Sequence, residues 1–126
     1  MKLSDEDARW LYPGKDLDDT AERLLKLGAG LAVITKGSQG SLLATTAARL
    51  SIPSVTSRVA DTIGAGDSYM AALILGLLTR GTDGFAPAVL EQVGRTAAMA
   101  AAITVRRPGA NPPTLEELRT HLQSAN

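Results

Sequence analysis

The sequence predicts a domain of the α/β class, in which helices flank a parallel β-sheet. Leu31 to Thr35 form a short, continuously apolar run that is bounded by glycines, as expected of a strand covered on both faces. The apolar residues from Leu17 to Leu27 recur at helical spacing, and residues 68–78 are apolar nearly all round, which predicts a largely buried helix. The 126 residues fit one compact domain, and no repeat or linker divides them.

The first two helices are indicated by caps and breakers. Ser4, followed three residues later by Asp7, predicts the N-cap of a short helix that residues 12–14 (YPG) end. The helix over 17–27 begins with acidic residues, which the helix dipole favours, and the glycines within 28–30 close it.

Three more short strands are expected after the run 31–35, which ends in a turn over 36–40. They are predicted at 41–46, 49–52 and 55–59, with Pro53 and Ser54 separating the last two.

Three helices are expected in the second half of the chain. The largely buried helix starts at residues 65–68, directly after a glycine-rich segment. Pro87 suits the first turn of a helix that runs to about Val105, and Thr114 with Glu117 forms a capping box for a last helix that ends near Gln123.

The composition excludes several classes of function. Thirteen Lys and Arg balance thirteen Asp and Glu, and aromatic residues make up 3%, so no nucleic-acid partner is expected. The chain has no cysteine and one histidine, His121, which argues against disulfide frameworks, thiol nucleophiles and Cys/His zinc sites. Any catalysis must therefore use carboxylates, hydroxyls, backbone amides and bound ions. No run reaches the roughly 18 apolar residues of a membrane span, and acids replace the apolar stretch of a signal peptide, so we expect a cytoplasmic protein without a membrane partner.

The stretch from Asp61 to Asp67 (DTIGAGD) combines three properties that phosphate binding requires. Gly64 and Gly66 leave backbone N–H groups open, and the helix start at Ala65 adds free amides and the positive end of a dipole. Asp67 would accept a proton from an attacking hydroxyl while the amides hold the developing phosphate charge. The sequence thus predicts a base and an anion site side by side.

A purely structural interpretation of this stretch stays open. Asp67 would then only favour the helix dipole, and the glycines would only form a tight strand-to-helix turn. The helix that follows is too apolar for a surface element, so its N-terminus must face buried protein or a cleft.

A second glycine-bracketed turn follows the buried strand directly. Ligands collect beyond the C-terminal ends of strands in open α/β sheets, so the hydroxyl of Thr35 and the bare backbone of Gly37 and Gly40 suit a nucleotide. A turn that merely joins two strands of a hairpin is an equally good interpretation. Neither glycine cluster fits GxxxxGK[ST] or GxGxxG, which disfavours a Walker-type ATPase and a standard dinucleotide enzyme.

Two further segments are weaker candidates. Ser4 and Asp7 would reach a metal ion or a phosphate through a water molecule, although helix capping alone explains them. The irregular loop 107–113 (RPGANPP) offers backbone carbonyls to a cation, but Arg106 and Arg107 are equally explained as charges at a helix end.

Taken together, these stretches resemble the C-terminal half of the ribokinase, or PfkB, family of carbohydrate kinases. The segment DTIGAGD with its apolar helix matches the second signature of that family, and the resemblance runs from Lys2 to about Leu122. Supporting segments follow in the right order: KLSDED at 2–7, VITKGSQG at 33–40 and RPGANPP at 107–113. The sequences of the segments SDED, YPG and RPGANPP are most similar to those of bacterial fructokinases. The implied fold is the C-terminal portion of the Rossmann-like ribokinase fold, with residues 1–126 as its nucleotide-binding and catalytic half.

The resemblance also implies roles for individual residues. Asp67 would be the catalytic base toward a sugar hydroxyl, and the anion hole would consist of the amides of Gly64, Ala65 and Gly66. The implied ATP site is lined by Thr35, Gly37 and Gly40, with Ala97 and neighbouring alanines beside the adenine. Mg²⁺ would accompany ATP, and a potassium-like ion (K⁺) would lie near Asp61, Ile63, Arg107 and Gly109.

The sequence departs from the family in two respects. The Asn-x-x-Glu motif of the family appears only as Ser4-x-x-Asp7, and a full member is well over twice as long. The missing N-terminal half carries the first signature, most sugar contacts and the lid. The predicted sheet would therefore lack strands and leave an edge for that half or for a second copy of the chain.

We therefore expect an ATP-dependent sugar kinase with fructose as the favoured sugar. Two alternatives remain: a truncated, inactive fragment that at most binds nucleotide, and a kinase of the same family for another sugar or a nucleoside.

Overall fold

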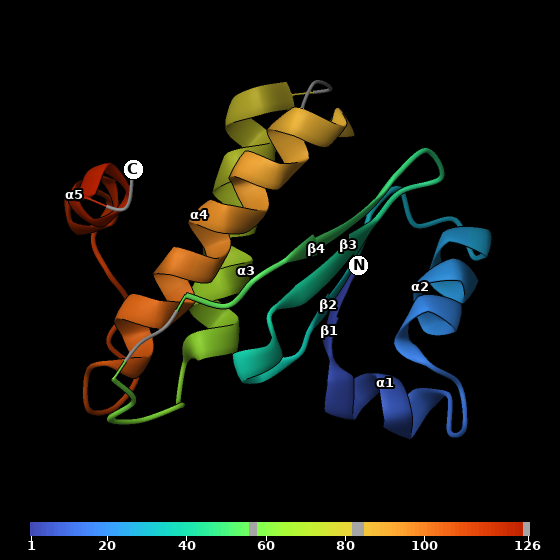
Figure 1. The fold of residues 1–126 in the computed structure, drawn as a ribbon, viewed down its shortest axis with the longest axis horizontal. Coiled ribbons are helices and arrows are strands. Elements are labelled where there is room, and N and C mark those ends of the chain that lie inside the picture. Colours follow the sequence, from blue (N-terminus) through green and yellow to red (C-terminus); the bar gives the residue numbers. More distant parts are fainter. Residues whose placement is uncertain (56–57, 82–84, 125–126) are drawn as a thin grey trace.

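The computed structural model describes residues 1–126 except 56–57, 82–84 and 125–126, and shows an open sheet with helices on both faces (Figure 1). The four strands lie side by side in the order β1 (Lys2–Ser4), β2 (Ala32–Thr35), β3 (Ser41–Ala44) and β4 (Arg49–Ile52). The helices are α1 (Asp5–Leu11), α2 (Leu17–Lys26), α3 (Ala65–Arg80), α4 (Pro87–Val105) and α5 (Leu115–Ser124), and a short 3-10 helix, η1 (Gly37–Gln39), joins β2 to β3. The predicted α/β class is confirmed.

The sheet is mixed. β1 and β2 pair in parallel, with α1 and α2 as their crossover, whereas β2 with β3 and β3 with β4 pair antiparallel. The expectation of a parallel sheet therefore holds for one of these pairs. Residues 36–40 and 45–48 are too few for a parallel crossover, which needs about a dozen residues or more. The turn after β2 therefore joins the two strands of a hairpin, which leaves its backbone open to a ligand as well.

Three expectations for the elements are corrected by the structure. The helix expected to be largely buried, α3, buries only one face, and its other apolar side chains, such as Leu75 and Leu78, are exposed. β1 was not among the predicted strands, because three residues carry too little periodicity to be recognised. The strand expected at 55–59 is not found at Val55, Arg58 or Val59, and residues 56–57 lie outside the described residues. The chain after them is held elsewhere, since the amides of Ala60 and Asp61 both donate to the Val105 carbonyl, at 2.6 and 3.1 Å.

The predicted helix caps are present at both ends of the chain. Ser4 and Asp7 form a reciprocal capping box at the start of α1, with the Asp7 amide 3.1 Å from Ser4 Oγ. Thr114 and Glu117 do the same for α5, because each backbone amide donates to the other side chain at 3.2 Å. Helix capping thus accounts for the Ser4 and Asp7 pair.

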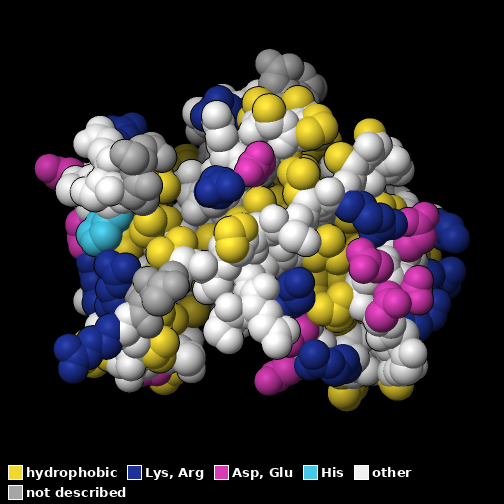
Figure 2. Space-filling view, in the orientation of Figure 1, with side chains coloured by type: hydrophobic (Ala, Val, Ile, Leu, Met, Phe, Trp, Pro, Cys, Tyr) yellow, Lys and Arg dark blue, Asp and Glu magenta, His cyan; other side chains and the backbone are white. Residues whose placement is uncertain are grey.

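The alternation of side chains along the central strands divides the core into two layers. Leu3, Ile34 and Leu42 face α1 and α2, whereas Val33 and Leu43 face α3 and α4. Figure 2 shows charged side chains of both signs gathered over α2, the solvent side of the first layer. No helix within the described ranges is long and apolar enough to cross a membrane.

Candidate active site at the start of helix α3

Two buried hydroxyl pairs hold the first turn of α3 in place. Tyr69 and Ser41 lie with their side-chain oxygens 2.7 Å apart, which ties α3 to β3. Thr104 Oγ1 donates to Ser68 Oγ at 2.6 Å, which ties α3 to α4. Each residue is at most 6% exposed, so both pairs lie in the protein interior. The start of this largely apolar helix is therefore fixed against two neighbouring elements.

The turn that leads into α3 leaves several backbone amides open. Gly64 caps the helix with a φ of +82°, a left-handed conformation that L side chains rarely adopt, and no side chain caps this end. The Ala65 amide donates to the Thr62 carbonyl at 3.3 Å. The amides of Gly64, Gly66 and Asp67 have no acceptor among the residues that the structure describes. Open amides at a helix N-terminus attract an anion.

This arrangement refines the predicted anion hole. Of its three expected donors, Gly64 and Gly66 keep open amides, whereas the Ala65 amide is already paired. The amide of Asp67 is open as well. Its carboxylate is exposed and forms no hydrogen bond or ion pair within the described part of the chain, so it is available to accept a proton.

A cavity of about 620 Å³ opens beside this turn. Thr35, Gly37 and Gly40 line it from the hairpin, and Ala65 and Gly66 line it from α3. Its apolar wall comes from α4 and from the segment before the glycines, namely Ala98, Ala101, Ala102, Val105, Val55 and Val59. The hairpin residues predicted to bind nucleotide therefore share one cavity with two residues of the predicted anion hole, whereas Gly64 and Asp67 are not among the residues that line it.

Ala97 differs from its predicted place. It is fully buried within the core and is not among the residues that line the cavity. The helical period puts Ala98, Ala101 and Ala102 on the cavity side instead, because residues three and four apart share a helix face. Three alanines near Ala97 therefore line the cavity in its place.

Gly40, which lines the cavity, lets the hairpin turn approach the end of β4 closely. Its φ is +90°, and a Cβ at this position would lie 2.2 Å from the Ile52 carbonyl oxygen. No other residue fits there without moving β4. The Lys36 amide donates to the Gly40 carbonyl at 2.8 Å and closes the turn.

Asp61 joins the glycine-rich turn to the loop after α4. Its carboxylate accepts the Ile63 amide at 2.9 Å and the Gly109 amide at 3.1 Å. These hydrogen bonds, that of Ile63 first, lower the pKa of Asp61 below its usual value. Three of the four residues predicted near a potassium-like ion are thus in contact around a persistent negative charge.

Arg107 is the fourth of these residues, and its side chain already has partners. Its guanidinium group donates to the Pro112 carbonyl at 3.3 Å and pairs with Glu117 of α5. In the described part of the chain no three His, Asp or Glu side chains gather as a metal site.

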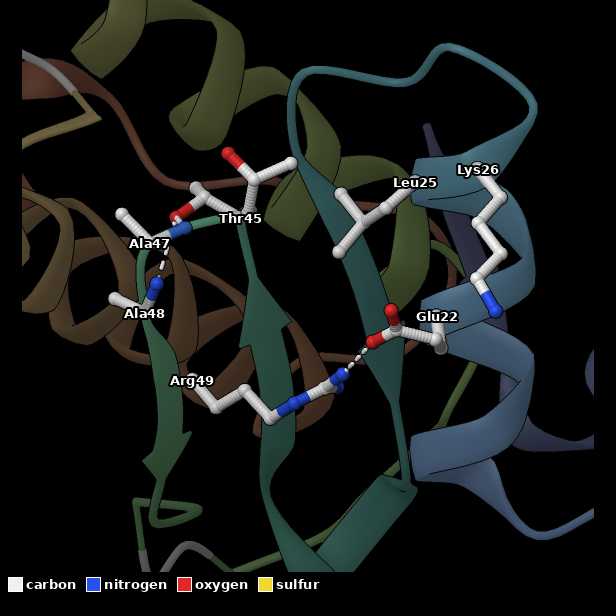
Figure 3. Close-up of a pocket in the computed structure, with 8 residues that line it drawn as sticks. Glu22, Leu25, Lys26, Thr45, Ala47, Ala48 and Arg49 are labelled. Atoms are coloured by element: carbon white, nitrogen blue, oxygen red, sulfur yellow. Dashed lines mark hydrogen bonds and ion pairs between the residues drawn. The ribbon is translucent and has the colours of Figure 1, made fainter.

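A second cavity, of about 390 Å³, lies between α2 and the β3–β4 turn (Figure 3). Arg49 of β4 pairs there with Glu22 of α2, and a second guanidinium nitrogen lies 3.8 Å from Asp18. Thr45 Oγ1 accepts the amides of Ala47 and Ala48 at 3.2 and 3.1 Å. These polar groups satisfy one another, so this cavity is explained by the packing of α2 on the hairpin.

Three residues at or beside the first turn of α3 were not predicted from the sequence, and one of them, Tyr69, lines the first cavity. The hydroxyls of Ser68 and Tyr69 carried a usable signal, because polar atoms on the buried face of a helix need partners. Lys2 carried none. Its ammonium nitrogen would lie 3.2 Å from a Cβ at Gly66, a contact between positions 64 residues apart in the chain that only the sheet creates.

The fold and the site together define an α/β protein with open amides at a helix start beside a largely apolar cavity. The chain belongs to the pfkB family of carbohydrate kinases, whose family model matches residues 1–118. A fructokinase from Rhizobium leguminosarum bv. trifolii is 40% identical over 77 residues, which are 61% of this chain and 24% of that protein.

Solved structures agree with this assignment. A ribokinase from Thermotoga maritima superposes with a TM-score of 0.84 at 26% identity over 97% of this chain. An aminoimidazole riboside kinase from Salmonella enterica, solved with its riboside and an ATP analogue, superposes with a TM-score of 0.83 at 28% identity over 96% of this chain. Each of those two chains is covered to 41%. The chain thus spans less than half the length of the relatives that it matches.

Proposed function

We propose that residues 1–126 form the ATP-binding and phosphoryl-transfer portion of an ATP-dependent sugar kinase, with fructose as the favoured sugar. The observation that carries this proposal is the cavity of about 620 Å³ whose wall includes Ala65 and Gly66, directly before Asp67. A volume of this size suits a cofactor-sized ligand. The ATP analogue in the Salmonella riboside kinase supports ATP as that ligand.

The cavity has distinct ends for the parts of a nucleotide. The alanine-rich face of α4 and Val59 would take the base. The phosphates would lie at Gly66, which lines the cavity and has an open amide, with the open amides of Gly64 and Asp67 beside it in the chain. Thr35 and the bare backbone of Gly37 lie on the hairpin side, where they suit the ribose and the phosphate chain. Adenine would thus contact Ala98, Ala101 and Ala102.

The transfer step follows from the neighbouring positions of Asp67 and the open amides. The sugar hydroxyl gives its proton to the Asp67 carboxylate as its oxygen forms a bond to the γ-phosphorus, and the bond between that phosphorus and the ADP oxygen breaks. The amides of Gly64, Gly66 and Asp67 hold the negative charge of the transferring group. Positioning and electrostatic stabilisation supply the catalysis.

Two cations fit this scheme. Mg²⁺ neutralises phosphate charge when it is bound with ATP. A monovalent cation such as K⁺ would be held by Asp61 and by backbone oxygens of Ile63, Arg107 and Gly109. The bound cation would then hold the glycine-rich turn and the loop after α4 together, next to the anion hole.

Fructose as the substrate is supported by the 40% identity to a fructokinase. The sugar site itself would lie mostly in a further part of the kinase or in a partner. α3 supports this view, because it exposes Met70, Ile74, Leu75 and Leu78, the last to 77%. Exposed apolar residues on one helix indicate a surface that another element covers. β1 at the edge of the sheet also has an open side for a further strand.

A second candidate function is that of a fragment that binds nucleotide without transferring phosphate. It is favoured by the coverage of only 24% to 41% of the relatives. A further candidate is a kinase that acts on a nucleoside instead of a sugar. The structural similarity to the Salmonella riboside kinase supports it.

The experiment is calorimetric titration of the folded chain with Mg·ATP, followed by an assay of phosphate transfer to fructose. Binding with transfer supports the sugar kinase, and binding without transfer supports the nucleotide-binding fragment. A folded chain that binds no ATP would overturn both. Adding other sugars and nucleosides to the assay identifies the acceptor.

A further inference from the structure

We propose that Lys2 belongs to the phosphoryl site and that its ammonium group contacts the terminal phosphoryl group of ATP. The inference rests on the proposed function and adds a residue to it from the other end of the chain. Three observations carry it: the register of β1, the distance from Lys2 to Gly66, and the lack of a protein anion for the ammonium group.

The sheet register directs Lys2 toward α3. Lys2 is the register partner of Val33, and Leu3 is that of Ile34. Leu3 and Ile34 belong to the layer under α1 and α2, whereas Val33 belongs to the layer under α3 and α4. Because successive side chains on a strand point to opposite faces, Lys2 lies on the face that α3 covers.

The ammonium group of Lys2 reaches the first turn of α3. A Cβ built on Gly66 would lie 3.2 Å from Lys2 Nζ, so the absence of a side chain at Gly66 makes room for this contact. Gly66 also lines the large cavity and has an open amide. Lys2 Nζ and the cavity therefore meet at the same residue.

The positive charge of the Lys2 ammonium group beside Gly66 would be stabilised by an anion. Lys2 is only partly exposed, and no carboxylate of the described residues lies within ion-pair distance of it. The start of a helix carries a partial positive charge, so a second positive group beside it is unfavourable when the site is empty. A phosphoryl group bound between the two would remove this repulsion and contact both.

The position along the nucleotide follows from Asp67. The base that accepts the sugar proton must lie next to the phosphoryl group in transfer, and Asp67 follows Gly66 directly in the chain. A cation beside Gly66 is therefore nearer to the terminal phosphoryl group than to the two phosphates that remain in ADP. Cations in this position stabilise the charge that phosphoryl transfer develops.

The test compares Mg·ATP with Mg·ADP by calorimetry on the folded chain, using Lys2→Met, Lys2→Arg and the control Lys15→Met. Lys15 is exposed in the loop between α1 and α2. Because a charge-assisted hydrogen bond is lost, Lys2→Met should weaken Mg·ATP binding about tenfold and leave Mg·ADP binding within about twofold. Lys2→Arg should keep most of the ATP affinity, and Lys15→Met should change neither. Circular dichroism of each variant checks that the fold is retained.

Each outcome decides a different point. ATP binding by the unmodified chain with no loss in Lys2→Met would overturn the role of Lys2 and leave the proposed function intact. Equal losses for ATP and ADP would place Lys2 at another phosphate and overturn the assignment to the terminal one. A folded unmodified chain that binds neither nucleotide would overturn the proposed function, and with it the role of Lys2.

Discussion

The phenolic oxygen of Tyr69 lies 2.7 Å from the hydroxyl oxygen of Ser41, inside the core and at the wall of the large cavity. This contact joins α3, which carries the glycine-rich turn, to β3, which follows the hairpin turn. The two segments predicted to bind nucleotide are therefore held together by one hydrogen bond between residues 28 positions apart. The geometry of the cavity depends on it.

Tyr69→Phe should lower the free energy of unfolding by about 1–3 kcal/mol, because it leaves the buried Ser41 hydroxyl without a partner. Urea denaturation measures this loss. The double variant Tyr69→Phe/Ser41→Ala should lose less than the sum of the single variants, since it removes both partners. Tyr12→Phe is the matched control, because the Tyr12 hydroxyl has no partner among the described residues. Additive losses in the double variant would show that the two hydroxyls are not coupled.

The stability of the chain should fall at alkaline pH because of the same residue. Burial raises the pKa of Tyr69 above its usual value of 10.0. The folded state therefore keeps a proton that the unfolded state loses, so this contribution is complete below about pH 10 and is lost as the pH rises through the folded pKa. Chemical denaturation at a series of pH values should show a shallower alkaline decline for Tyr69→Phe. Identical slopes for the two proteins would contradict this assignment.

Gly40→Ala should destabilise the chain by about 3 kcal/mol or more, because the new Cβ would collide with the Ile52 carbonyl at a φ that only glycine adopts readily. Gly37→Ala is the matched control: its φ is also positive, at +55°, but nothing lies within 4 Å of the new Cβ. We expect a loss of about 1 kcal/mol there. Thermal unfolding of both variants measures the difference, and equal losses would mean that β4 moves aside freely.

Asp67→Asn should lower kcat about 10²-fold to 10⁴-fold in a kinase that contains this chain, while the affinity for ATP changes little. The amide is nearly the same size as the carboxylate but cannot accept the sugar proton. Steady-state assays with fructose and ATP, together with nucleotide titration, separate the two effects. Near-normal turnover of the variant would remove Asp67 from the role of base.

Asp61→Ala should abolish any effect of K⁺ on nucleotide binding. The substitution removes the negative charge and both hydrogen bonds that join Ile63 to Gly109. We expect Mg·ATP to bind the unmodified chain more tightly in KCl than in choline chloride of equal ionic strength, and the variant to bind equally in both. A K⁺ effect that survives in Asp61→Ala would place the cation elsewhere.

The helices and the anion-binding turn could be read from local sequence. Capping residues such as Ser4 and Thr114, the apolar period of α2 and α4, and the glycines before Asp67 act over a few residues, so their effects do not depend on the rest of the fold. The same holds for Thr35, Gly37 and Gly40, which follow the most apolar strand. These local signals were sufficient for the fold class and for five residues that line the cavity, namely Thr35, Gly37, Gly40, Ala65 and Gly66.

Strand pairing could not be predicted from local sequence signals. β1 is a strand only because β2 lies beside it, and the chain near Val59 is not one because Ala60 and Asp61 bond to the end of α4. A three-residue strand has little preference of its own, and its backbone hydrogen bonds come from a partner that is distant in sequence.

By itself the sequence determined which segments become helices, where a glycine-rich turn leaves amides open at a helix start, and the family resemblance that the DTIGAGD segment carries. Only the tertiary structure decided that the hairpin strands run antiparallel, that Ala98 and not Ala97 faces the cavity, and that Lys2 reaches Gly66. The physical reason is the range of the forces involved. Caps, turns and helical periods depend on neighbours in the chain, whereas contacts such as that of Lys2 with Gly66 exist only after β1, β2 and α3 have packed together.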